Sequence, residues 1–141
     1  MSTVPEIVGI EKVVDALGAW PSFHDAEILR LALDRDPNRA GEAPTLQLQV
    51  RVRRYREQGI GTADFQLALT HDVVIELAFS DISDLEISGF NGQNVIDDID
   101  LRQSKAGDTI AVQIESVYGV GASWHCRAVT VSEVRAVHGV A

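Results

Sequence analysis

The sequence contains a single cysteine, no long hydrophobic run and, over its central third, no basic residue. Because Cys126 is alone, an internal disulfide bond is excluded, and nothing points to an oxidising compartment. No apolar stretch approaches the roughly 20 residues that a membrane-spanning helix needs, and no basic segment precedes an apolar one near Met1. These absences predict a cytoplasmic protein that does not bind membranes.

Lysine and arginine are absent between Arg56 and Arg102, whereas the same stretch holds ten of the 21 carboxylates. The other eleven are matched by twelve basic residues, so this stretch accounts for the formal charge of −9. Such a field attracts cationic partners and repels nucleic acid and anionic membranes. An acidic exterior that only confers solubility would have the same composition, so the charge alone leaves both interpretations open. The ten are Glu57, Asp64, Asp72, Glu76, Asp81, Asp84, Glu86, Asp97, Asp98 and Asp100.

The length of 141 residues is that of one domain, and we expect residues 1–141 to form a single unit. Apolar residues make up 45% and charged residues 23% of the chain, which is typical of a globular protein. The sequence has no internal repeat, low-complexity tract or linker that would divide it.

One helix is predicted close to the N-terminus. Thr3 and Glu6 have the spacing of a capping box, apolar residues follow at helical spacing, and Gly18 can end the helix, while Gly9 can interrupt it. The apolar residues of this helix are Ile10, Val13, Val14 and Leu17.

The remaining sequence alternates apolar and polar residues with a period of two, which is typical of half-buried strands. In the first strand Leu29, Leu31 and Leu33 are predicted to share the inner face, until residues 34–38 form a turn. A further strand is predicted from Trp124 to Val131. The other inward-facing sets are Leu46, Leu48, Val50 and Val52; Val73, Ile75, Leu77 and Phe79; Leu85 and Ile87; and Ile110, Val112 and Ile114.

Residues 95–101 fit either one helical turn or a strand, residues 80–83 predict a tight connection, and residues 58–64 predict a mobile loop. Many short alternating strands behind a single helix predict an α+β fold. We expect a predominantly antiparallel, strongly curved or barrel-like β-sheet with one N-terminal helix packed on it.

Residues 20–27 are the densest group of chemically versatile side chains. His24, Asp25 and Glu27 could ligate a divalent metal, with His71 and Asp72 completing the site. However, neighbouring residues on a strand point to opposite faces, so His24 and Asp25 cannot both ligate a metal without a turn between them. We therefore favour a structural role, in which both side chains bond to the backbone, and expect no metal and no other cofactor.

The aromatic residues of the same motif, Trp20 and Phe23, are assigned to the core, where a corner fixed by Pro21 would set the helix against the sheet.

Catalytic motifs are absent: there is no glycine-rich phosphate loop, Gly-x-Ser-x-Gly, His-Glu-x-x-His or Cys-x-x-Cys. Cys126 beside His125 resembles a nucleophile and base, but strand neighbours diverge, so we predict a buried, inert thiol. We therefore expect no enzymatic activity. The four arginines within residues 51–56 accompany only one aromatic residue, Tyr55, in a chain of pI near 4.7, so we predict that they pair with acids across the sheet and not with nucleic acid.

Three motifs spread over most of the chain carry a family resemblance. The first is Trp20-Pro-Ser-Phe-His-Asp-Ala-Glu-Ile28, and the second runs from Leu85 to Val95 through Gly-Phe-Asn-x-Gln-Asn. The third combines Ser-x-Tyr-Gly at 116–119 with Cys-Arg at 126–127. In this order the motifs resemble the immunity protein 50 family of bacterial polymorphic toxin systems.

The resemblance implies a small cytoplasmic protein that binds a cognate toxin domain and blocks it. The charge provides a separate physical reason, because a toxin that cleaves nucleic acid needs a cationic cleft, which acidic strands can fill as a phosphate mimic. Aromatic anchors would add affinity, although core packing is an equal alternative for them. The predicted partner-binding residues are Asp81, Asp84, Glu86, Asp97, Asp98 and Asp100, with Phe90 and Tyr118 as the anchors.

Two other functions stay open. The chain could be a general protein-interaction module or, less favoured, a small metal-dependent enzyme centred on His24, Asp25 and Glu27. An exposed strand edge could also pair with a second copy and give a homodimer.

Overall fold

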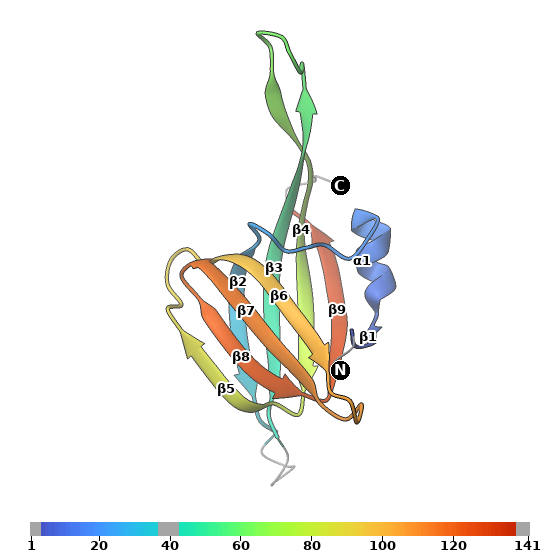
Figure 1. Ribbon diagram of the computed structural model, residues 1–141, viewed down its shortest axis with the longest axis vertical. Helices are drawn as coiled ribbons and strands as arrows, with labels where there is room; N and C mark the ends of the chain where they lie inside the picture. Colours follow the sequence, from blue (N-terminus) through green and yellow to red (C-terminus); the bar gives the residue numbers. More distant parts are fainter. Residues whose placement is uncertain (1–3, 37–42, 138–141) are drawn as a thin grey trace.

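The computed structural model describes residues 4–36 and 43–137, in which the chain forms one nine-stranded sheet and one short helix (Figure 1). The strand order across the sheet is β1-β9-β4-β3-β2-β6-β7-β8-β5. The elements are β1 (Ile7–Val8), α1 (Ile10–Leu17), β2 (Glu27–Asp34), β3 (Thr45–Gln58), β4 (Gln66–Ser80), β5 (Ser83–Ser88), β6 (Val95–Gln103), β7 (Ile110–Tyr118), β8 (Gly121–Cys126) and β9 (Ala128–Ala136).

Neighbouring strands run antiparallel, except that the two-residue strand β1 pairs parallel with β9. The prediction of a mostly antiparallel sheet with one N-terminal helix is therefore confirmed. The prediction of a barrel is wrong, because β1 and β5 are the two edges of an open sheet. How strongly the sheet is curved stays a prediction.

The core lies between two parts of this one sheet. Phe79 of β4 and Trp124 of β8 touch edge to face, with ring centroids 5.0 Å apart, although four strands separate β4 from β8 in the sheet order. Figure 1 shows β6 and β7 passing in front of β3 and β4. The two parts are joined where β2 meets β6, at the pair Glu27 and Val95. An eight-residue helix could not cover such a sheet, so the sheet supplies most of its own cover.

The alternation predicted for β3, β4 and β7 is confirmed, since every inward residue of these strands is buried. In β2 the prediction is wrong for Leu29, which is 41% exposed while Ile28 is buried; Leu33 lies opposite the buried Leu46, although it is 47% exposed near the end of the strand. The reason is a register shift between Ile28 and Arg30, which places Leu29 in a bulge and turns Leu31 toward the core.

At residues 95–101 the structure decides between two predicted elements, and at residues 124–131 it differs from the prediction. Residues 95–101 belong to strand β6, so the helical alternative is wrong. The predicted strand from Trp124 to Val131 is two strands, β8 and β9, separated at Arg127, whose backbone N–H donates to the carbonyl of Ser80. The tight connection at residues 80–83 is confirmed, with Asp81 at φ 55°.

The helix α1 begins later than the capping-box pattern predicts. Glu6 lies before β1, Thr3 lies outside the described residues, and the N-cap is Gly9, which makes no side-chain cap. The capping box is therefore wrong for Glu6. Gly18 ends the helix as predicted, with φ 87° and its N–H donating to the carbonyl of Val14.

Three contacts fix α1 on the sheet. Val13 and Leu17 are buried, the Lys12 ammonium donates to the backbone carbonyls of Val131 and Ser132, and the Arg54 guanidinium donates to the last helical carbonyl, that of Leu17, at 2.7 Å. The helix thus lies against β9 (Figure 1), and its C-terminal end contacts Arg54 of β3.

Strands β3 and β4 extend past the rest of the sheet as a long hairpin, at the top of Figure 1. Beyond Val52 and Val73 the two strands are paired with each other, while the pairing of β2 with β3 starts only at Arg51. We call residues 53–71 the arm. The predicted loop at residues 58–64 is the tip of this arm, and its mobility stays a prediction.

Candidate functional site

Strand register gathers carboxylates on the outer side of β6, β7, β8 and β5, which we call the outer face. Directly opposed residues of antiparallel strands share a face. Asp100 opposes Gln113, which opposes Ser123, which in turn opposes Glu86, so these four form one row across four strands. The adjacent row contains Asp98 opposite Glu115.

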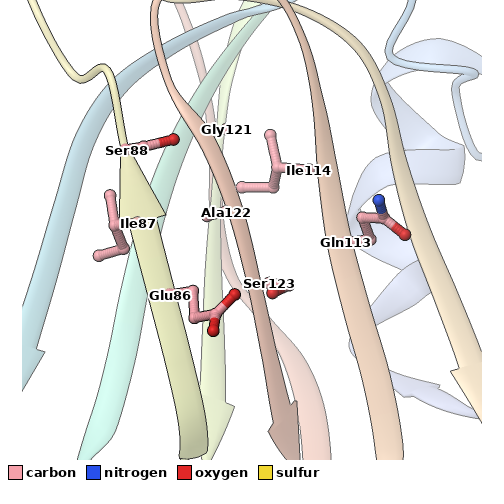
Figure 2. A pocket seen from close by; sticks show the side chains of 8 residues that line it. All are labelled: Glu86, Ile87, Ser88, Gln113, Ile114, Gly121, Ala122 and Ser123. Atoms are coloured by element: carbon pink, nitrogen blue, oxygen red, sulfur yellow. The ribbon is translucent and has the colours of Figure 1, made fainter.

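Two shallow hollows of about 310 Å³ each mark this face. Figure 2 shows the first, where the Glu86 carboxylate of β5 points toward Ser123 of β8. The second is lined by Asp84, Asp100, Arg102 and His125 among others. Both hollows are open to solvent and their volume is at the lower end of the range of ligand pockets, so the face offers a contact surface more than a binding pocket.

Part of the negative charge on the outer face has a local partner. The Arg102 guanidinium lies 2.7 Å from Asp100, and the His125 ring nitrogen Nδ1 lies 3.3 Å from Asp84. The latter contact is an ion pair only when His125 is protonated, and its geometry is not that of a hydrogen bond. Within the described residues Glu86, Asp98 and Glu115 form no ion pair.

Two of the six predicted carboxylates lie elsewhere. Asp97 is at a bulge in β6 and accepts a 2.7 Å hydrogen bond from His24 Nδ1, and Asp81 is in the β4–β5 turn. Glu115 was not among the predicted residues, because it lies outside the stretch without basic residues. The alternation of Ile110, Val112 and Ile114 already indicated that Glu115 faces outward.

Phe90 and Tyr118 are 48% and 58% exposed, so core packing does not account for them. Phe90 lies in the loop after β5 and Tyr118 ends β7, where Gly89 approaches Gly119 so closely that a side chain at either glycine would meet backbone atoms. Both glycines have positive φ, which suits this approach. The aromatic side chains therefore project beside a tightly packed pair of loops, at the ends of β5 and β7.

Asn94 holds these loops together from a buried position, with only 3% of its surface exposed. Its Oδ1 accepts hydrogen bonds from the backbone N–H groups of Asn91 and Val120, at 3.0 and 3.1 Å. Its Nδ2 donates to the Asn91 carbonyl at 2.8 Å, and its own carbonyl accepts from the N–H of Ile28. The Asn94 side chain thus joins the second sequence motif to Val120, which follows the Ser-x-Tyr-Gly part of the third, while its backbone carbonyl joins the same motif to β2.

In the first motif, Phe23 is buried and packs edge to face on the half-buried Trp20, with centroids 5.3 Å apart. Phe23 and Asp25 both have positive φ, which places a turn between helix and strand. His24 and Asp25 are mostly exposed, and the His24 ring bonds to Asp97 where we expected a backbone group. Glu27 begins β2 opposite Arg51.

The environment of His24 raises its pKa above the ordinary value of 6.5. The hydrogen bond to Asp97 is the largest cause, and the nearby charge of Asp25 adds to it. In the described part of the chain, no group of three His, Cys, Asp or Glu side chains is arranged to hold a metal ion.

Cys126 is buried, and burial raises the pKa of its thiol to about 12. A thiol with this pKa is almost entirely protonated at neutral pH, so it is a poor nucleophile, as predicted. Arg51 forms two hydrogen bonds to the buried carboxylate of Asp72, at 2.8 and 2.6 Å. For this arginine, the predicted pairing with an acid across the sheet is confirmed.

The sequence pattern of the family described as Immunity protein 50 matches residues 9–137, which include all three motifs, the outer face and the arm. The chain belongs to the Immunity protein 50 family. A comparison with curated proteins gave no match, and a comparison with solved structures gave none either. For this family member, no helix among the described residues is long and apolar enough to cross a membrane.

Proposed function

We propose that this protein neutralises a cognate toxin domain by binding it through the outer face, without catalysing a reaction. Membership of the Immunity protein 50 family supports an immunity role. The observation that carries the choice of surface is the strand register, which gives Glu86, Asp98, Asp100 and Glu115 a common face although β5 and β7 are separated along the chain.

The charge of this face favours a toxin with a cationic cleft, and a nuclease has one because its substrate is anionic. Three carboxylates without an ion pair would accelerate the encounter with such a cleft. We further propose that the complex forms in the bacterial cytoplasm, where a nuclease would otherwise reach its substrate.

Charge provides steering and specificity more than affinity, so the complex also needs apolar anchors. Phe90 and Tyr118 suit this role, since they are half exposed and their loops are held by Asn94. A rigid loop loses little conformational entropy when it binds, which makes an aromatic side chain on it an effective anchor.

The first test uses the cognate toxin domain, to be sought among the genes next to that of this protein. Replacing Glu86 and Glu115 with Gln, and Asp98 and Asp100 with Asn, should lower the association rate constant about tenfold at low salt, because electrostatic steering is lost. The salt dependence of that rate should also become weaker. Stopped-flow fluorescence at several salt concentrations measures both quantities.

The matched control removes four negative charges away from the outer face, by Glu11→Gln, Asp15→Asn, Asp64→Asn and Glu133→Gln, which are exposed on α1, at the tip of the arm and on β9. Both variants have the same net charge. If the control slows association as much as the outer-face variant does, net charge and not the outer face would steer the encounter.

Rescue of cells that express the toxin domain tests the neutralising role itself. The unaltered protein should restore growth, and Phe90→Ala with Tyr118→Ala should weaken the rescue while the protein stays folded. No rescue by the unaltered protein, together with many unrelated copurifying proteins, would instead support a general interaction module.

A further inference from the structure

One side of the arm is apolar and uncovered. Tyr55 opposes Leu69, and Glu57 opposes Leu67, so these side chains share one side of the two-stranded ribbon. Tyr55, Leu67 and Leu69 are 53%, 59% and 41% exposed, and we call these three residues the arm face. The opposite side of the ribbon carries Arg56, Gln58, Gln66 and Ala68.

An amphipathic ribbon of two strands is marginally stable in water unless its apolar side is covered. Phe65 and Ile60, close to the tip, are 52% and 70% exposed and enlarge the apolar area. A contiguous apolar patch on a soluble domain marks a site of interaction with another molecule. The charges around the arm face indicate which molecule that is.

Arg53 and Glu57 are exposed on the same side of β3, one on each side of Tyr55. They cannot pair within one copy, since four residues along a strand separate them by roughly 13 Å. When two arms stack antiparallel about a two-fold axis at Tyr55, Arg53 of each copy meets Glu57 of the other. A two-fold contact requires this kind of self-complementarity.

We propose that the arm face binds the arm face of a second copy of this chain and forms a reversible homodimer. The arm holds three arginines and two carboxylates, a net charge of +1, so the rest of a chain of charge −9 carries −10. Two copies therefore repel each other over most of their surfaces and can approach closely through the arms.

The size of the contact predicts a weak dimer. The three side chains of the arm face with Phe65 and Ile60, which are 41% to 70% exposed, would bury roughly 400 Å² per copy, about half of what a standard stable interface buries. We therefore expect monomers at low micromolar concentration and dimers at several hundred micromolar. This inference does not depend on the toxin or on the outer face.

Sedimentation equilibrium of the purified chain tests the proposal directly. The weight-average mass should rise with concentration from 15.3 kDa toward twice that value. Leu67→Thr with Leu69→Thr should raise the dimer dissociation constant at least about tenfold, because four leucines lose their contacts. The matched control, Gln66→Thr with Ala68→Thr on the opposite side of the same strand, should leave the constant unchanged.

A charge swap tests the register of the two copies. Arg53→Glu and Glu57→Arg should each weaken the dimer, and the double variant should restore it. An unaltered chain that stays monomeric at every concentration, or a dimer that survives the two leucine substitutions, would overturn the proposal. If the dimer survives the leucine substitutions, the edge strand β5 becomes the candidate contact. If the unaltered chain stays monomeric, loss of toxin binding by the leucine variant would assign the arm face to the toxin.

Discussion

At the scale of single residues, the buried Asn94 side chain holds together the loop between β5 and β6 and the loop between β7 and β8. Asn94→Ala removes three side-chain hydrogen bonds and leaves the N–H of Val120 without its acceptor in a buried place. We expect the free energy of unfolding to fall by about 2–4 kcal/mol. Urea denaturation measures the loss, with the exposed neighbour Gln93→Ala as the control, which should cost less than about 0.5 kcal/mol. Equal losses in the two variants would contradict the role of Asn94.

The second residue-scale prediction concerns the charge on His24. Because Asp97 raises the His24 pKa, the contact adds stability that is complete below pH 6.5 and is lost as the pH rises through the higher pKa of the folded protein. NMR titration of the ring should give a pKa above 6.5. Asp97→Asn should lower that pKa more than Asp25→Asn does, since Asp97 is the larger cause. The reverse order would show that the hydrogen bond is not decisive.

At the scale of elements, substitutions at two glycines distinguish the energetic cost of backbone strain from the cost of displacing α1 from the sheet. Gly9 and Gly18 both have positive φ, but a Cβ at Gly9 would lie 2.7 Å from the Val131 carbonyl oxygen, whereas nothing lies within 4 Å at Gly18. Gly18→Ala should therefore cost about 1 kcal/mol from strain alone. Gly9→Ala should cost at least about 2 kcal/mol, because α1 must also move off β9. Similar losses in denaturation experiments would mean that the close approach is unimportant.

The same elements indicate how far the sequence predicts this fold. Alternation located β3, β4 and β7 correctly because these strands bury one full side, and the period of two follows directly from the pleat. It failed in β2, where the bulge at Leu29 depends on pairing with β3 and leaves no mark in the local sequence. It could not decide between helix and strand at residues 95–101, since a bulge at Asp97 gives Ile96 and Ile99 a helical spacing within a strand.

At the scale of the whole molecule, the outer face arises from register between distant segments. The charge of the central stretch was visible in the sequence, but Asp81 and Asp97 could not be separated from Asp98 and Asp100 before the pairing was known. Glu115 could not be predicted from a run of charge along the chain, because the outer face is defined by pairing across strands. The apolar arm face was missed for the same reason, since Tyr55 and Leu69 become neighbours only in the hairpin.

The whole molecule also carries like charges directly opposite each other, at Asp98 and Glu115 of the outer face and at Glu76 and Glu133 of β4 and β9. Such a pair destabilises a sheet by roughly 0.2–1 kcal/mol, so Glu115→Gln should stabilise the free protein by about 0.5 kcal/mol at low salt. The gain should shrink as salt screens the repulsion.

If the outer face binds the toxin, Glu115→Gln should also slow association, because stability is gained at the expense of a charge that steers the partner. Glu133→Gln relieves the other pair and should stabilise the protein by a similar amount without changing the association rate. Denaturation and stopped-flow measurements on these two variants show whether the charge of Glu115, unlike that of Glu133, contributes to binding the toxin. Equal association rates for both variants would mean that the repulsion at Asp98 and Glu115 has no part in recognition.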